Sequence, residues 1–531
     1  MAGAQITGLR EHNDGPMTGP TAPRGRLAGA VEFARRQPGR LLAYILTLHV
    51  VIWTLLPILV CPNLQLDLVE DLALGKEWQL GYWKHPPLPW WLADIAYRIT
   101  GDIHAIYLLG PLSAAACMYF VWRLAREVVP PLPALASVLA LEGIHFFNFS
   151  VVKFAHDQMQ LPFWALTGWV FYRAVTTGRI LDWALSGAFL ALAFWSKYAA
   201  FALSATLGLF LLFDPQARQC WRTVGPYIMA LVFLLVLAPH LWWLIDSGFA
   251  PFRYVDSRAI AATHWYDFVW FPLRWTLSQI FFLVPALILL ALLLRGAATR
   301  RAGLREDFTY RYVLALAFGP FAVTTLAAAL FGRLPVAMWG YPLWSFLPLA
   351  IVMTFDTAIP AKRLGHFARA FLGIFVATPV LYAGIELFEP FLRDRVKATQ
   401  FPGRPMAEAI TQQWRSRTGA TLVYVSGRET TPPGTGEFAA NNLAVYSPDR
   451  PHVVVHGKLA LSPWIDPADL ARRGAVLVWE MDTEAAALPA DLRAAFPTAE
   501  MQPPLVLRRQ NLRPRSPAIV GYAFVLPRDQ K

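Results

Sequence analysis

The chain has 531 residues, of which 56% are hydrophobic and 15% are charged, whereas a soluble domain has about 45–50% apolar and about 25% charged residues. This composition excludes a disordered chain and argues against an ordinary soluble enzyme, and the 14% of aromatic residues suits membrane interfaces. A net charge of +12 fits basic loops that face an anionic leaflet, so we expect membrane lipid and no nucleic acid as a partner. The composition therefore predicts a polytopic membrane protein.

Long apolar segments follow a polar, basic N-terminal stretch. Residues 1–40 have no apolar core of the signal-peptide type, so we expect a cytoplasmic tail. Residues 41–60 form the first apolar run, which is long enough in a helix to cross about 30 Å of hydrocarbon. The further candidate spans are 103–122, 130–147, 158–172, 181–195, 200–213, 224–245, 276–294, 312–331, 339–357 and 370–388. We expect an α-helical membrane domain of about 11–13 transmembrane helices over residues 41–390.

The distribution of basic residues predicts the orientation of these spans. With the N-terminus inside, the inner segments carry 20 Lys and Arg residues and the outer segments 9, although the two sets have nearly equal length. An odd number of spans then places residues 391–531 on the outer side. Short apolar runs alternate there with helical pieces, which is typical of a small α/β domain.

The outer segments hold most of the unusual polar residues. The first of them, residues 61–102, is rich in Trp, Leu and Tyr, which predicts amphipathic helices lying in the interface. It also contains a cluster of acids and then the stretch GYWKHPPLP at residues 81–89, whose prolines enforce extended geometry and would hold the neighbouring side chains in place. The polar residues singled out in the outer segments are Asp67, Glu70, Asp71, Tyr82, Lys84, His85, Asp157, Lys197, Tyr198, Arg258 and Arg333.

Each of these residues also has a purely structural interpretation. Lys197 could cap a membrane helix, Asp157 could be a helix N-cap, and Arg258 could anchor the chain at the interface. The convergence of acids and cations on one face of the membrane, from segments far apart in sequence, favours a functional site, because ionisable groups at membrane depth are costly. Cations would neutralise a leaving phosphate, and a carboxylate would take a proton from an attacking hydroxyl.

At these residues the sequence resembles the GT-C membrane glycosyltransferases, in the bacterial branch of the protein-mannosyltransferase and aminoarabinose (lipid A) transferase superfamily. The GYWKHPPLP stretch, Asp67 before it, Asp157 before an apolar helix, and the run Ser196-Lys197-Tyr198 carry the resemblance. Many family members have Asp-Glu where this chain has Asp67-Leu68, so both Glu70 and Asp71 are candidates for the displaced second acid. The resemblance covers residues 41–360, and the family commonly adds an extracytoplasmic C-terminal domain.

The resemblance implies a reaction on the periplasmic face of the bacterial inner membrane. A sugar on a polyprenyl phosphate would pass to an acceptor hydroxyl with inversion, and the expected acceptor is a glycolipid such as lipid A or its core, or a surface polysaccharide. A protein O-mannosyltransferase acting on Ser or Thr is the alternative enzyme. A transporter or flippase of lipid-linked substrates is the alternative of another class, but such proteins place their charges near the midplane and often show internal repeats, which we do not find.

The resemblance also implies roles for single residues. Asp67 would be the catalytic carboxylate that activates or orients the acceptor hydroxyl. Asp157 would assist it or bind the acceptor or the sugar, and Glu70 is a further catalytic candidate. The residues expected to bind the carrier phosphate or to shape its site are Lys84, Lys197, Arg258, Arg333, Tyr82, His85 and Tyr198. No ligand spacing demands a metal, so no cofactor is firmly expected, although a divalent cation is an option. One chain could contain the whole site, so we expect a monomer.

Overall fold

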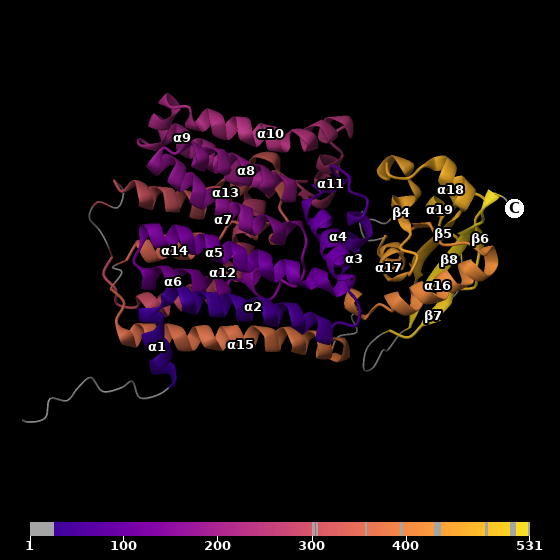
Figure 1. Cartoon of the computed structure of the whole chain (residues 1–531), viewed down its shortest axis with the longest axis horizontal. Helices are drawn as coiled ribbons and strands as arrows, with labels where there is room; N and C mark the ends of the chain where they lie inside the picture. The colour runs from indigo at the N-terminus through magenta and orange to yellow at the C-terminus, as the bar shows by residue number, and fades with distance from the viewer. Residues whose placement is uncertain are drawn as a thin grey trace, which may run out of the picture.

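The computed structural model describes residues 26–299, 303, 306–355, 358–392, 397–429, 437–483, 487–509 and 517–528. A bundle of membrane helices carries a smaller α/β domain at one end (Figure 1). This architecture confirms the predicted fold class. The expected N-terminal tail is described only from helix α1 (Arg26–Arg36) onward, because residues 1–25 lie outside the described part.

Each of the eleven predicted spans coincides with helical structure. The helices concerned are α2 (Pro38–Val60), α5 (Leu109–Val128), α6 (Pro131–Leu139), α7 (His156–Thr177), α8 (Ile180–Ser196), α9 (Ala200–Phe213), α10 (Gly225–Asp246), α12 (Asp267–Leu294), α13 (Phe308–Phe331), α14 (Leu347–Met353) and α15 (Ala361–Leu392). Among the described residues, six segments are long and apolar enough to cross a membrane: Pro38–Val60, Ile103–Val128, Gly225–Asp246, Asp267–Leu294, Phe308–Phe331 and Ala361–Glu389.

Two of the predicted spans are broken rather than continuous. The segment 130–147 holds the short helix α6 and then two 3-10 turns, Ala140–Gly143 and His145–Phe147. A Cβ at Gly143 would lie 2.5 Å from the backbone nitrogen of Ala286, so this turn lies directly against helix α12. The described part of the segment 339–357 holds the end of a 3-10 turn, Ala337–Gly340, and the seven-residue helix α14. The first turn of α14 holds a proline, as is common at helix starts.

Small residues allow the bundle helices to approach closely. Helix α8 packs against α7 and α10, and a Cβ at Gly187 of α8 would lie 2.2 Å from the carbonyl oxygen of Met229 in α10. Small residues at such crossings let two backbones come together in a membrane.

We expect the substitution Gly187→Ala to destabilise the bundle by about 1–3 kcal/mol, because the added methyl group must push α8 and α10 apart. The matched control is Gly208→Ala in α9, where an added Cβ meets nothing within 4 Å. That change should be neutral or stabilising by up to about 1 kcal/mol, because alanine favours a helix. Thermal unfolding of the two variants in one detergent checks the contrast, and equal shifts in Tm would show that the close approach carries no energetic weight.

The first outer segment forms two helices, α3 (Leu66–Gly75) and α4 (Leu88–Thr100), which pack against each other. Together with α11 (Ala250–Arg258) they lie between the membrane helices and the C-terminal domain (Figure 1). The strands β1 (Ile260–Ala261) and β2 (Arg333–Leu334) pair antiparallel and tie the chain after α11 to the chain after α13. These pieces form the end of the bundle at which the candidate site lies.

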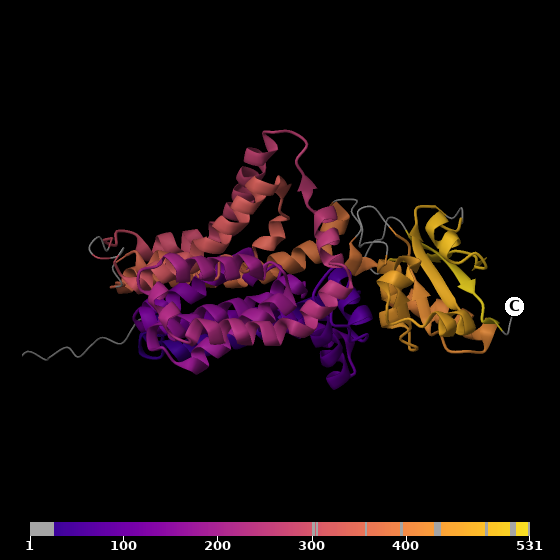
Figure 2. The same ribbon diagram turned by 90° about the horizontal axis from the view of Figure 1, so that it is seen from above.

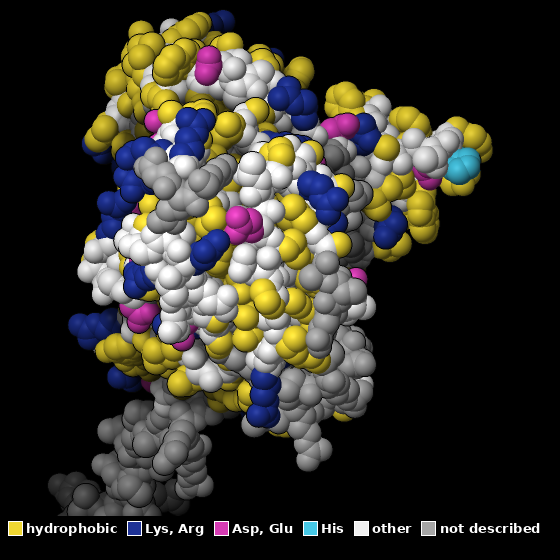
Figure 3. All heavy atoms as spheres, turned by 90° about the vertical axis from the view of Figure 1, so that its right-hand side faces the viewer, with side chains coloured by type: hydrophobic (Ala, Val, Ile, Leu, Met, Phe, Trp, Pro, Cys, Tyr) yellow, Lys and Arg dark blue, Asp and Glu magenta, His cyan; other side chains and the backbone are white. Residues whose placement is uncertain are grey.

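The segment after α11 projects from the bundle. Figure 2 shows the start of α12 leaning away from the other helices, and Figure 3 shows mainly hydrophobic side chains on this projection. Trp265 is 82% exposed, Val269 69% and Phe281 75%. Apolar side chains exposed in this way on a membrane helix are suited to contact with lipid.

The C-terminal domain contains a mixed sheet. Its elements are α16 (Gly403–Thr418), β3 (Tyr424–Ser426), α17 (Phe438–Tyr446), β4 (His452–Val454), α18 (Pro467–Arg473), β5 (Ala475–Met481), α19 (Ala490–Ala495), β6 (Glu500–Met501), β7 (Leu505–Leu507) and β8 (Ala518–Val525). The strand order is β4-β3-β5-β8-β6, and β7 also pairs with β8. Strands β4, β3 and β5 are parallel, and β8 runs antiparallel to β5.

The C-terminal domain packs directly against the first outer segment. Helix α17 packs against α3, and Asn63 Nδ2 donates a hydrogen bond of 3.0 Å to Asn442 Oδ1. The imidazole of His452, at the start of edge strand β4, lies 2.9 Å from the Glu77 carboxylate. The domain is therefore held against the same segment that carries the predicted acids.

Candidate active site

A cavity of about 420 Å³ lies where the first outer segment, α11 and the ends of α7 and α8 meet. This volume is in the range of sites that take a small ligand. Most of the residues singled out from the sequence line it: Asp67, Glu70, Asp71, Lys84, His85, Asp157, Lys197, Tyr198 and Arg258. Residues nearly two hundred positions apart in sequence are thus brought to one place by the fold.

Two lysines in the cavity are each paired with a carboxylate. Lys84 Nζ lies 2.5 Å from Glu70 Oε1, and Lys197 Nζ lies 2.6 Å from Asp157 Oδ1. Lys197 is the C-cap of α8, and Asp157 is in the first turn of α7, so the ends of two adjacent helices form the second pair. A lysine ammonium has three N–H groups, so each pair can hold its cation in place and still donate to a ligand.

Burial opposes charge on Glu70 and on Lys84. It raises the pKa of the Glu70 carboxyl, an effect that the adjacent Lys84 ammonium partly offsets. For Lys84, burial favours the neutral amine, but the Glu70 carboxylate, together with Tyr254 and Asp67, outweighs this effect and raises the pKa. Each group therefore depends on its partner, and removal of one would leave a charge buried alone.

The acids Asp67 and Asp71 lie four residues apart on α3 and therefore on one face of the helix. Asp71 is 1% exposed, and burial, with the charges of Asp67 and Glu70, raises its pKa well above its usual range. The raised pKa favours the neutral carboxyl of Asp71, which is the wrong form for a base. Asp67 is half-buried at the cavity wall and makes no ion pair or hydrogen bond with any residue that the structure describes.

Two histidine rings pack against each other beside the lysines. The rings of His85 and His156 are 4.1 Å apart, and His156 Nε2 lies 3.0 Å from the carbonyl oxygen of Pro86. Burial, together with the charge of the neighbouring His156, holds the pKa of His85 well below its usual range. His85 is therefore neutral at pH 7 and serves as a polar, uncharged wall.

Tyr198 links the end of α8 to the first outer segment. Its hydroxyl lies 2.9 Å from His240 Nε2, and the other ring nitrogen of His240 lies 2.7 Å from the carbonyl oxygen of Leu80. Through His240, Tyr198 therefore holds the backbone at Leu80, four residues before Lys84, in place.

Two of the predicted residues do not line the cavity. Tyr82 is buried behind the wall, where its hydroxyl donates to the carbonyl oxygen of Leu74 at 2.9 Å and its ring packs against Trp90 at 4.1 Å. Arg333 forms an ion pair with Asp256 and so ties β2 to α11. Both residues shape the surroundings of the site and make no contact with its interior.

The structure adds apolar lining residues that the sequence did not single out. Trp90, Phe201 and Phe252 line the cavity. Nothing in the sequence separates them from the many other aromatic residues of a membrane interface. Among the described residues, no group of three or more His, Cys, Asp or Glu side chains is arranged to hold a metal ion.

The chain was compared with known protein families, curated proteins and solved structures. Residues 84–243 match the family described as dolichyl-phosphate-mannose-protein mannosyltransferase. No curated protein matches the chain.

The fold is similar to that of ArnT from Cupriavidus metallidurans bound to undecaprenyl phosphate, with a TM-score of 0.60 and 13% identity over 90% of this chain and 97% of that chain. For the same protein in the apo state the TM-score is 0.59, with 14% identity over the same shares of 90% and 97%. The fold confirms the resemblance to the GT-C membrane glycosyltransferases at the level of fold, and the family match over residues 84–243 agrees with it.

Proposed function

We propose that this membrane glycosyltransferase of the GT-C type transfers a sugar from a polyprenyl-phosphate donor to a hydroxyl group of a glycolipid, such as lipid A or its core, or of a surface polysaccharide. The reaction takes place on the periplasmic face of the bacterial inner membrane. The observation that carries the proposal is a cavity that holds two carboxylates without an ion-pair partner among the described residues, Asp67 and Asp71, beside two lysines, Lys84 and Lys197. Burial raises the pKa of Asp71, so Asp67 is the better candidate for a base. The structural likeness to ArnT, which was solved with undecaprenyl phosphate, supports the choice of donor.

Asp67 acts as the general base in this proposal. Its carboxylate takes the proton of the acceptor hydroxyl while the hydroxyl oxygen attacks the anomeric carbon. The bond between that carbon and the phosphate oxygen breaks, and its electron pair leaves with the polyprenyl phosphate. One displacement at the anomeric carbon inverts its configuration.

The cations stabilise the leaving phosphate. Lys84 and Lys197 are held by Glu70 and Asp157, and Arg258 lines the cavity from the last turn of α11. Charges fixed before the reaction, in a site with little water, stabilise developing negative charge strongly. Lysine offers a point charge to phosphate, and arginine offers a two-pronged donor.

The apolar lining suits the rest of the donor. Phe201, Phe252, Val336 and Met338 line the cavity on the side of α9, α11 and the chain after β2. We propose that the first isoprene units of the carrier lie along them. The C-terminal domain, residues 391–531, helps to select the acceptor, and one chain holds the whole site, so the protein works as a monomer.

A protein O-mannosyltransferase acting on Ser or Thr is the second candidate. The family match at residues 84–243 favours it, because that region includes Lys84, Asp157 and Lys197. Both candidates use the same donor chemistry and differ only in the acceptor.

The experiment that separates them is transfer by the purified protein in liposomes, with a panel of radiolabelled polyprenyl-phosphate sugars and crude membranes as acceptor. Label in a glycolipid or polysaccharide fraction supports the proposal, and label on protein supports the second candidate. If no donor transfers sugar while the chain moves a solute or a lipid across the bilayer, the protein is a transporter or flippase.

A further inference from the structure

An unusual histidine lies where the C-terminal domain meets the candidate active site. His456 follows edge strand β4 and has a φ of +52°, in the left-handed region that non-glycine residues rarely adopt. The structure around it enforces this conformation, because Gly457 N donates to Ser426 Oγ at 3.0 Å and Val455 N donates to Ser462 Oγ at 2.8 Å. Backbone strain that is held in this way is frequent at functional sites.

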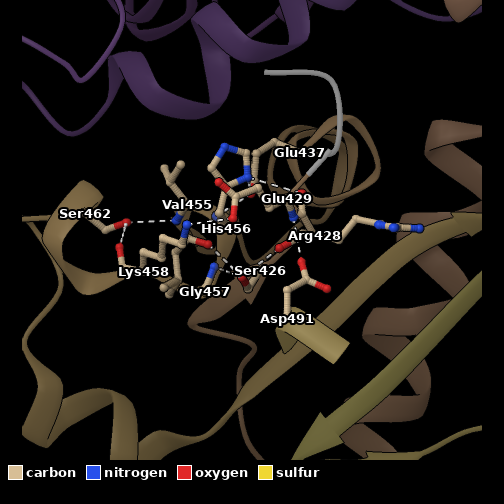
Figure 4. Close-up of polar contacts among 12 residues, drawn as sticks. Ser426, Arg428, Glu429, Glu437, Val455, His456, Gly457, Lys458, Ser462 and Asp491 are labelled. Atoms are coloured by element: carbon tan, nitrogen blue, oxygen red, sulfur yellow. Dashed lines mark hydrogen bonds and ion pairs between the residues drawn. The ribbon is translucent and has the colours of Figure 1, made fainter. Parts of the chain in front are cut away.

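His456 is paired with a buried carboxylate. Its Nδ1 lies 3.0 Å from Glu437 Oε1, its backbone N–H donates to the same oxygen, and both side chains are almost fully buried. Figure 4 shows the pair, with the His456 ring lying toward the ribbon of the membrane domain. The other ring nitrogen, Nε2, is buried and has no hydrogen-bond partner among the described residues.

The ring of His456 contacts the loop that carries Lys84. It packs edge-on against Trp83, with ring centres 5.4 Å apart, and the Trp83 ring lies 5.4 Å from Lys84 Nζ. On another side Trp83 packs against Tyr254 of α11 at 5.1 Å. The ring of Trp83 therefore lies between His456 of the C-terminal domain and the ammonium group of Lys84.

Electrostatic interactions also connect His456 with the Lys84–Glu70 pair, through Glu437. The carboxylate of Glu437 raises the pKa of His456, against the effect of burial. The charge of Glu437 also contributes to the raised pKa of Glu70, the partner of Lys84. A protonated His456 balances Glu437 and so limits this effect on Glu70.

The remaining charged groups near the pair come from the two segments that follow β3 and β4. The backbone carbonyl oxygen of Arg428 lies 3.2 Å from His456 Nδ1. Glu429 favours the protonated imidazole and is itself bound by Lys458 at 2.6 Å. Glu437 is therefore the carboxylate in direct contact with the imidazole.

We infer that His456 is a positioning residue for the Lys84–Glu70 pair, acting through the ring of Trp83, so that the C-terminal domain completes the active site. The inference rests on the proposed function only in assigning Lys84 to the carrier phosphate. Protonated His456 keeps Trp83 seated and Glu437 neutralised, and Lys84 then faces the phosphate. Precise placement of such a group has a large effect on rate, because small displacements in an active site are costly.

A double-mutant cycle on His456→Ala and Trp83→Ala tests this coupling. We expect either change to lower kcat/KM by roughly tenfold or more, and the double variant to be no slower than Trp83→Ala alone, because both act through one contact. The matched control is His452→Ala, which removes another histidine–carboxylate pair between the domains, with Glu77, away from Trp83. In its cycle with Trp83→Ala the two effects should multiply.

A second readout does not depend on transfer. Binding of undecaprenyl phosphate, followed by the shift in Tm, should weaken in His456→Gln, which keeps a donor of similar size but not the charge. Binding should also weaken as pH rises through the pKa of His456, and Glu437→Gln should move that loss to lower pH. These variants need only bind the lipid, so this test does not require sugar transfer. A wild-type chain that transfers no sugar would overturn the proposed function, whereas the binding data alone decide on the role of His456.

Two results would overturn the inference. One is a His456→Gln variant that folds and binds undecaprenyl phosphate as tightly as the wild type at every pH. The other is multiplication of the His456→Ala and Trp83→Ala effects, which would show that they act independently.

Discussion

Replacing Asp67 by Asn lowers the rate of sugar transfer by about 10²- to 10⁴-fold, because the amide has the same shape but cannot take the proton of the acceptor hydroxyl. Binding of the donor should change little, since Asp67 contacts no cation among the described residues. Single-turnover transfer of radiolabelled sugar, at saturating donor, measures the effect on the chemical step.

The control for this prediction is Asp71→Asn on the same face of α3. Burial raises the pKa of Asp71 well above its usual range and so favours the neutral carboxyl, which asparagine imitates. Activity should therefore stay within a few-fold of the wild type. An active Asp67→Asn variant would remove Asp67 from the role of base. An Asp71→Asn variant that loses activity while Asp67→Asn keeps it would assign that role to Asp71.

Replacing Lys84 by Met should produce the second largest effect, on both stability and transfer. The change leaves Glu70 buried without its partner, which costs about 3–5 kcal/mol for an uncompensated charge, less what protonation of Glu70 recovers. In the proposed mechanism it also removes a cation from the leaving phosphate, which should lower kcat by about 10²- to 10³-fold. Thermal unfolding and the transfer assay measure the two losses separately.

The double variant Lys84→Met/Glu70→Gln separates the two roles. With the buried charge removed, Tm should return most of the way to the wild-type value, while transfer should stay low. Arg36→Met provides the stability control, because Arg36 forms an exposed ion pair of 2.6 Å with Glu32, and the loss of such a pair costs at most about 1 kcal/mol. Recovery of transfer in the double variant would mean that Lys84 only neutralises Glu70.

The membrane domain could be predicted closely from hydrophobic length alone. Residues 200–213 and 181–195, for example, were expected as spans and form α9 and α8 with nearly the same bounds. The breaks within 130–147 and 339–357 could not be foreseen in this way. An apolar run has the same composition whether its backbone is an α-helix or a series of 3-10 turns.

The site could be predicted in part. Motif residues such as Asp67, Lys84 and Lys197 could be singled out as charged residues of the outer segments, and they meet in one cavity. A charged residue in an outer segment can line the cavity or lie behind it, and the sequence does not distinguish the two cases. Arg333 was therefore predicted together with the residues that line the cavity. The contact between His456 and Trp83 joins two segments more than 370 residues apart and depends on how one domain docks on the other.

The most direct test of the account is the release of the carrier during transfer. The purified chain is given a doubly labelled donor, with one isotope in the sugar and another in the polyprenyl phosphate, together with the membrane acceptor. We predict one polyprenyl phosphate released for each sugar transferred, with inverted configuration in the product, and no transfer from nucleotide sugars. Transfer from a nucleotide sugar without the carrier, or carrier turnover without a glycosylated product, would contradict the account.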